Sequence, residues 1–175
     1  MCARCVDENK IEIRLQGGLQ PIVECLASKD IKTKRDSLRT ICNLSINGEN
    51  KIQLRPLGAL RHVIECLSIE DPECKRYAVA SLINLSGDEE NESDIRTMGG
   101  LAPVLDCVQS SDIETKKFSL RALCSLSAHD GNKEALGAMA VTDKILPCLK
   151  DADVEVRLRV LLIVWLLFWH RWADG

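Results

Sequence analysis

The sequence has few aromatic residues. Phe, Tyr and Trp together make up 3% of its 175 residues, although hydrophobic residues as a whole reach 46%. The core must therefore be built from Leu, Ile, Val, Ala and Cys, which suits closely stacked helices. An excess of positive charge is also missing, because the formal net charge is −3. General nucleic-acid binders usually carry a basic excess over the whole domain, so the composition argues against that class.

Catalytic motifs are missing as well. The three histidines are scattered, no Ser or Cys nucleophile has a base paired with it by motif, and no phosphate-binding loop appears. Cys2 and Cys5 form a lone C-x-x-C, and a zinc site would need a second pair of ligands that no nearby His or Cys supplies. We therefore expect a protein that is not an enzyme and that has no cofactor or metal.

No cleavable signal sequence is visible, although the chain has nine cysteines. Free thiols in a reducing compartment are the simpler interpretation, which predicts a cytoplasmic location, with the nucleus as an alternative. Four cysteines lie in apolar runs and are expected to be small buried hydrophobes: Cys25, Cys66, Cys107 and Cys148.

These four cysteines also reveal a repeat of 41 residues. The same spacing separates Asp30, Asp71, Asp112 and Asp153, and it separates Asn50, Asn91 and Asn132. A period of about 40 to 47 residues is the signature of a helical solenoid, in which each unit buries its apolar face against its neighbours. The sequence predicts a partial repeat over residues 1–9 (the end of a third helix and a turn), repeats over 10–50, 51–91 and 92–132, and a divergent repeat over 133–172 with an apolar Trp-rich last helix.

Each unit is predicted to contain three helices. A short first helix ends at glycine in three copies, at Gly17, Gly58 and Gly99, because glycine accepts the left-handed conformation that stops a helix. The second helices are expected over residues 19–28, 60–68, 101–110 and 142–150. The third helix opens at the Asp of each unit, whose side chain can accept hydrogen bonds from first-turn N–H groups. Its core stripe is predicted to be Leu38, Ile41 and Leu44, then Val79, Leu82 and Leu85, then Leu120, Leu123 and Leu126, then Leu161, Val164 and Leu167.

The segments at 41–51 and 83–91 resemble the armadillo repeat. Both contain Asn-Leu-Ser followed by a turn and another Asn, and Gly58-Ala59-Leu60 resembles the family's glycine before an apolar second helix. The resemblance covers nearly the whole chain and implies an all-α, right-handed armadillo-type α-solenoid of about four three-helix repeats. Adhesion-junction catenins, nuclear import adaptors, vacuolar tethers and plant ubiquitin ligases share the pattern, so it does not identify the member.

The resemblance also implies a binding site. In the family the third helices line a concave groove, and the Asn of Asn-Leu-Ser hydrogen-bonds the backbone of an extended partner peptide; the matching residues here are Asn43 and Asn84. The alternative is that each Asn merely satisfies local carbonyl groups. The third copy has Ser125 and the fourth Leu166 at this position. The copies lack the Trp four residues earlier that clamps lysine side chains in import adaptors, so basic localisation signals are not the expected partner.

Residues four and seven before that Asn share its helix face. They include Asp36, Arg39, Tyr77, Phe118 and Arg121. Arg39 and Arg121 would favour an extended segment that carries carboxylates or phosphates with an apolar residue. A second basic column at Lys34, Lys75, Lys116 and Arg157 lies about 180° away from the Asn at 100° per residue and is expected to point outward.

The last helix is unusually apolar. From Leu158 to Trp169 only Arg159 is charged, and Trp165, Trp169 and Trp172 all lie in the last eleven residues. This run is shorter than the roughly 20 residues that cross a bilayer as a helix. Three explanations stay open: further repeats that cover it, self-association, or a helix lying in a membrane interface. We expect a protein-binding adaptor or scaffold, with a membrane-surface tether or the substrate-recognition part of a ubiquitin ligase as the alternatives.

Overall fold

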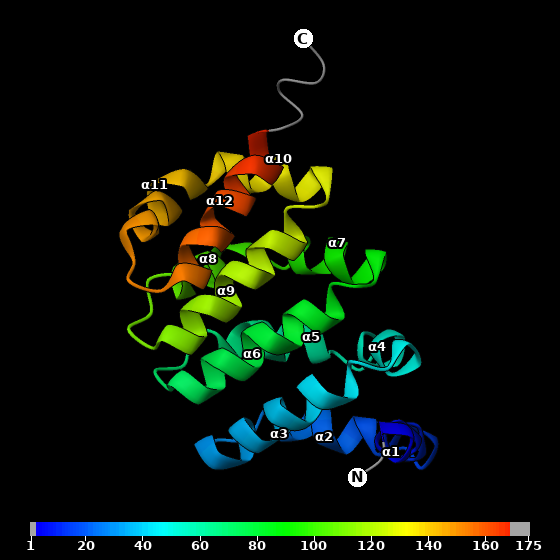
Figure 1. Ribbon diagram of the computed structural model, residues 1–175. Helices are drawn as coiled ribbons and strands as arrows, with labels where there is room; N and C mark the ends of the chain where they lie inside the picture. Colours follow the sequence, from blue (N-terminus) through cyan, green and yellow to red (C-terminus); the bar gives the residue numbers. More distant parts are fainter. Residues whose placement is uncertain (1–2, 169–175) are drawn as a thin grey trace.

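A computed structural model describes residues 3–168, which form helices joined by short turns (Figure 1). The first helices of successive units are α1 (Ala3–Leu15), α4 (Gly48–Leu54), α7 (Glu89–Thr97) and α10 (Asp130–Ala138). The second helices are α2 (Leu19–Cys25), α5 (Ala59–Cys66), α8 (Leu101–Cys107) and α11 (Val141–Ile145), the last continued by the 3₁₀ helix η1 (Leu146–Lys150). The third helices are α3 (Ile31–Leu44), α6 (Pro72–Leu85), α9 (Ile113–Leu126) and α12 (Val154–Phe168). The predicted all-helical repeat architecture is confirmed.

The third helices form a continuous row. α3 contacts α6, α6 contacts α9, and α9 contacts α12, while α2, α5 and α8 each contact the third helix of their own unit. Figure 1 shows this row running from the blue N-terminal end to the red C-terminal end of the molecule. Residues at one position of the repeat therefore lie on adjacent helices and form columns along the stack.

The predicted Asp caps open the third helices. Asp30, Asp71 and Asp112 accept hydrogen bonds from the backbone N–H groups of the residues three positions later, at 2.7, 2.8 and 2.8 Å. Asp153 accepts from the N–H groups of Glu155 and Val156, at 2.8 and 3.3 Å. At Asp112, the hydrogen bond from the Thr115 hydroxyl contributes most to a lowered pKa of the carboxyl group. The caps satisfy N–H groups that have no partner within the helix.

The predicted glycine stops are also confirmed. Gly17, Gly58 and Gly99 have φ angles of 73°, 80° and 75°, in the left-handed region. In the fourth unit Ala140 occupies the same position of the repeat and also has a positive φ, of 50°. The position therefore needs left-handed backbone whichever residue occupies it.

The predicted core stripe is buried in three units and wrong in the fourth. In α12 the buried residues are Val156, Val160 and Ile163, whereas Leu161 is 54% exposed. In α9 the corresponding stripe is buried, and α9 has a third helix on each side, α6 and α12. Among the described residues, no third helix follows α12, so only the face toward α9 and η1 is covered.

Other expectations also need correction. The turn expected within residues 1–9 is replaced by the continuous helix α1, because Val6 stands where later units have the side-chain caps Asn47 and Asp88. The second helix expected over residues 142–150 changes to a 3₁₀ helix near Pro147, which cannot donate a backbone hydrogen bond. Cys25 is exposed, unlike Cys66, Cys107 and Cys148. Cys2, Trp169 and Trp172 lie outside the described residues.

Buried asparagines connect the units. Asn50, on α4, donates from Nδ2 to the carbonyl oxygens of Leu44 (3.2 Å) and Lys10 (3.1 Å), which both belong to the preceding unit. Asn91 repeats this arrangement with Leu85 and Lys51, at 3.2 and 3.5 Å. These side chains are fully buried, so their role is to fix the position of one unit against the next.

Candidate functional site

The candidate binding residues all lie on third helices. Asp36, Arg39 and Asn43 come from α3, Tyr77 and Asn84 from α6, and Phe118, Arg121 and Ser125 from α9. We call the surface that these eight residues define the third-helix face. Because α3, α6 and α9 are consecutive members of the row, the repeat places the three groups on neighbouring helices.

Asn43 is open to a partner backbone on this face. It is exposed and borders a hollow of about 400 Å³ between α1 and α3. The hollow is lined by Asn9, Lys10, Ile13, Thr40, Asn43, Leu44 and Ile46. Its α1 residues were not anticipated from the sequence, because their position depends on how α1 packs against α3.

Asn84 is partly committed to the fold. It is half-buried, and its Nδ2 donates a hydrogen bond of 2.8 Å to the carbonyl oxygen of Cys42 on α3. The bond joins two units, so it differs from the local role that the sequence left as an alternative. A side-chain amide has two N–H donors and one acceptor oxygen, so the bond to Cys42 does not use the Oδ1 acceptor.

The two arginines of the face differ in their surroundings. The Arg39 guanidinium forms an ion pair of 3.0 Å with Asp36, one turn earlier on α3. The Arg121 guanidinium instead lies over the ring of Phe118, 5.3 Å from the ring centroid. Tyr77 has a similar neighbour, since the guanidinium of Arg76 lies 5.6 Å from its ring centroid and also pairs with Glu73 at 3.3 Å.

Ser125 takes the position that Asn occupies in the first two units. Its side chain is exposed, and its Oγ lies 3.4 Å from the Oγ of Ser86, which follows α6. A serine hydroxyl has a single donor and lies on a shorter side chain than an amide. Ser125 therefore offers a partner backbone fewer hydrogen bonds than an Asn would.

The second basic column has structural partners on the side of the second helices. Lys34 donates from Nζ to the carbonyl oxygen of Leu26 (2.7 Å), and Arg157 donates to the carbonyl oxygens of Asp151 and Ala152 (2.7 and 3.0 Å). Lys116 pairs with Asp151 at 2.7 Å. These cations bind the carbonyl oxygens and the Asp151 carboxylate at the turns that follow the second helices.

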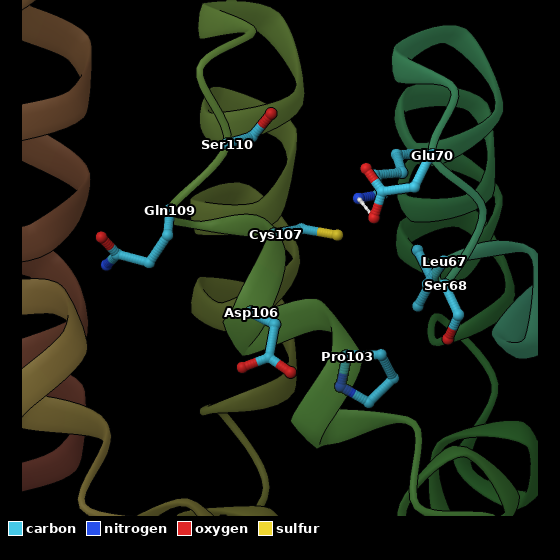
Figure 2. A pocket seen from close by; sticks show the side chains of 9 residues that line it. Leu67, Ser68, Glu70, Pro103, Asp106, Cys107, Gln109 and Ser110 are labelled. Atoms are coloured by element: carbon cyan, nitrogen blue, oxygen red, sulfur yellow. Dashed lines mark ion pairs between the residues drawn. The ribbon is translucent and has the colours of Figure 1, made fainter.

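Lys75, the remaining member of that column, borders a second hollow of about 300 Å³ between neighbouring units. Figure 2 shows Pro103, Asp106 and Cys107 on one side of it and Leu67, Ser68 and Glu70 on the other. Lys75 and Glu70 are 3.9 Å apart. Burial raises the pKa of the Cys107 thiol, although Lys75 opposes the shift, so the thiolate required for nucleophilic or metal chemistry is disfavoured there.

One cluster was not predicted from the sequence at all. Glu92 stands where earlier units have Lys10 and Lys51, and His129 stands where they have Asn47 and Asp88. The Glu92 carboxylate is buried, pairs with Nε2 of His129 at 3.0 Å, and accepts a hydrogen bond of 2.9 Å from Nδ2 of Asn132. The two departures from the repeat thus compensate each other across the junction between α7 and α10.

Comparison with known proteins agrees with this helical repeat architecture. Residues 7–46 match the family model described as Armadillo/beta-catenin-like repeat. No curated protein matches the chain. An engineered protein of known structure is 22% identical, with a TM-score of 0.85 over 90% of this chain and 65% of that one.

Two further solved structures carry the family name. A designed armadillo repeat protein in complex with the peptide (KR)4 is 19% identical, with a TM-score of 0.86 over 91% of this chain and 68% of the other. Computationally designed armadillo repeat proteins for modular peptide recognition are 21% identical, with a TM-score of 0.85 over the same shares. The chain spans 65–68% of the length of these three structures. Residues 7–46 thus match the armadillo repeat in sequence, and about nine-tenths of the chain shares the fold of designed armadillo repeat proteins.

Proposed function

We propose that this chain is a non-catalytic interaction scaffold, or adaptor, that binds an extended segment of a partner protein along the third-helix face. The observation that carries the proposal is the row of third helices, which presents the exposed side chains of Asn43 and Ser125 at one repeat position and that of Arg121 one turn earlier. The fold is shared with a designed protein in complex with a peptide, which supports a protein partner.

An extended segment suits this surface for a physical reason. Helices in contact are about 8–10 Å apart, and an extended chain advances about 3.3 Å per residue, so roughly three residues span one unit. A chain laid across the row would keep its backbone polar groups unpaired unless side chains of the face bind them. Asn43 and the Oδ1 acceptor of Asn84 are positioned on the face to supply such bonds.

The cysteines from Cys25 to Cys148 are free thiols, which fits the cytoplasmic location that we propose with this function. If the chain is the substrate-recognition part of a ubiquitin ligase, it would use the same face for its substrate. The experiment below therefore detects either role.

The test is selection from a random peptide library with the full chain, in parallel with an Asn43→Ala, Asn84→Ala double variant. We expect the native chain to enrich a shared extended motif and the variant to lose it, because both amides are removed. Since Asn84 also bonds to Cys42, helicity and urea unfolding of the variant must be measured alongside. A matched control is Glu49→Ala with Glu134→Ala, two exposed residues on first helices.

Enrichment of the same peptides by native and variant chains, or no enrichment by the native chain, would contradict the proposal. In that case the outer surface of α12 is the next candidate. Its residues Val154, Leu158, Leu161, Leu162 and Trp165 are each at least 40% exposed, and we call them the outer stripe of α12.

The outer stripe favours a second candidate function, binding to a membrane surface or to a second copy of the chain. Within residues 3–168 no helix is long and apolar enough to cross a membrane, so a membrane role would have to be interfacial. Leu158 occupies the position of Arg35, Arg76 and Lys117, which carry charge in the other units. The change makes an apolar surface continuous along the helix.

A further inference from the structure

Arg121 differs from Arg39, the other arginine of the third-helix face, and from the cations that flank this face. Ion pairs join Arg35 to Asp71 (2.7 Å), Arg39 to Asp36 (3.0 Å), Arg76 to Glu73 (3.3 Å), Lys117 to Asp153 (2.7 Å) and Arg159 to Glu155 (3.6 Å). Arg121 is exposed and forms no ion pair with any described residue, and its guanidinium lies over the Phe118 ring. The third-helix face therefore carries an uncompensated positive charge at one defined place.

Stacking on Phe118 prepares this charge for a ligand. A guanidinium over an aromatic face is attracted by the ring, and its in-plane N–H groups stay directed away from the ring. Those donors match the two oxygens of a carboxylate or of a phosphate. Because the ring already restricts the Arg121 side chain, this side chain would lose less conformational entropy on binding than an unrestricted arginine would.

The neighbourhood of Arg121 is apolar on the side of α12. Leu162 occupies the corresponding position on that helix and is 40% exposed, and Leu166 is half-buried one turn further on. On the side of α6 the corresponding residue is Ala80, which is small and buried. An anion at Arg121 would thus lie beside a surface that suits an aliphatic side chain. The cation at the Phe118 position of α12, Arg159, is paired with Glu155 (3.6 Å).

We propose that Arg121, held on Phe118, anchors an anionic side chain of the bound segment, and that an aliphatic side chain of that segment rests on Leu162 and Leu166. The inference rests on the proposed function and specifies the chemistry of its partner. At about 3.3 Å per residue and about 10 Å between helices, the two side chains would be two to four residues apart. Arg39, neutralised by Asp36, plays no comparable part.

The test uses fluorescently labelled dodecapeptides and anisotropy titration of the full chain. One probe repeats Glu-Val-Thr four times, a second has phosphoserine in place of each Glu, and a third has Lys; the β-branched residues keep all three extended. We expect the Glu or phosphoserine probe to bind about tenfold or more tightly than the Lys probe, and Arg121→Glu to remove most of that difference. The first two probes distinguish a carboxylate from a phosphate, and inorganic phosphate as competitor detects recognition of the anion alone.

The matched control is Arg39→Glu, which makes the same charge change at the same position of the repeat two units away. We expect it to weaken the anionic probes less than about threefold, because the native Arg39 charge is already paired. Arg121→Lys keeps the charge without the planar fork and should give an intermediate loss. Arg121 is exposed, so urea unfolding of both Glu variants should resemble that of the native chain.

Equal losses for the two Glu variants, or equally good binding of the Lys probe, would overturn this inference. Absence of binding by both anionic probes would overturn it too. Library selection separates these results from failure of the proposed function: enriched peptides that depend on Asn43 but carry no acidic residue would contradict the anion anchor alone.

Discussion

Glu92 shows how a single residue can depart from the repeat and remain in its fold. Its carboxylate replaces a backbone carbonyl as the acceptor for the buried asparagine of the next unit, and it lies 3.0 Å from Nε2 of His129. Burial raises the pKa of the Glu92 carboxyl, against the opposing effects of His129 and of the hydrogen bond from Asn132.

This shift gives a prediction about stability and pH. A carboxyl group whose pKa is raised by folding stabilises the protein below its unfolded pKa of about 4.3 and loses that contribution as the pH rises through the folded value. Glu92→Gln keeps an acceptor for Asn132 but does not titrate. We expect the free energy of unfolding of the native chain, relative to Glu92→Gln, to fall from pH 4 upward in urea titrations. Glu134→Gln, at an exposed site on α10, is the control, and a difference independent of pH would contradict the assignment.

At the scale of the helix, the stop after each first helix depends on one left-handed residue. Three units place glycine there and the fourth has Ala140, with φ of 50°. For a residue with a Cβ this conformation costs roughly 1–2 kcal/mol. Glycine avoids this cost, but part of the gain is offset because glycine has more conformational entropy to lose from the unfolded chain. The end of α10 is therefore strained relative to the ends of α1, α4 and α7.

Ala140→Gly should relieve this strain. We expect an increase of about 0.5–1 kcal/mol in the free energy of unfolding, measured in urea. The reciprocal change, Gly58→Ala, should destabilise the protein, and since an added Cβ there meets no atom within 4 Å, the loss would report backbone strain alone. A stabilised Gly58→Ala variant would show that the left-handed conformation is not required.

At the scale of the whole molecule, the two faces of α12 have different environments. The side toward α9 is buried through Val156, Val160 and Ile163, whereas the outer stripe is exposed. Two of the three internal cations at the position of Leu158, Arg35 and Lys117, pair with the Asp caps of the following third helices, Asp71 and Asp153. The third, Arg76, pairs with Glu73 on its own helix. Leu158 cannot form such a pair, so an apolar partner suits the stripe better than another Asp-capped helix.

Leu158→Lys tests the role of the stripe. If the stripe binds lipid, the native chain should float with neutral phosphatidylcholine vesicles and the variant should not; if it joins two copies, light scattering should show a concentration-dependent mass that the variant loses. Ala138→Lys, at an exposed position of α10, adds the same charge elsewhere and should change neither result. A native chain that is monomeric and does not float with the vesicles would exclude both roles.

Part of the candidate site could be predicted because its signals are local. The distinction between Arg39 and Arg121 follows from residues one turn earlier, Asp36 and Phe118, which the sequence already shows at the right spacing. The hydrogen bond from Asn84 to Cys42 could not be predicted in this way, because it joins two units. It depends on the distance between α3 and α6, which the packing of their buried side chains sets.

The same division runs through the fold. The 41-residue period, the Asp caps and the glycine stops determine where helices begin, end and turn, because each acts on backbone groups within a few residues of itself. Exposure was decided only when the units stacked. Cys25 is exposed, whereas the cysteines at the same repeat position are buried. Leu161 is exposed, whereas Leu120 is buried. In a solenoid a side chain is covered by the neighbouring units as well as by its own, so its exposure depends on the stacking.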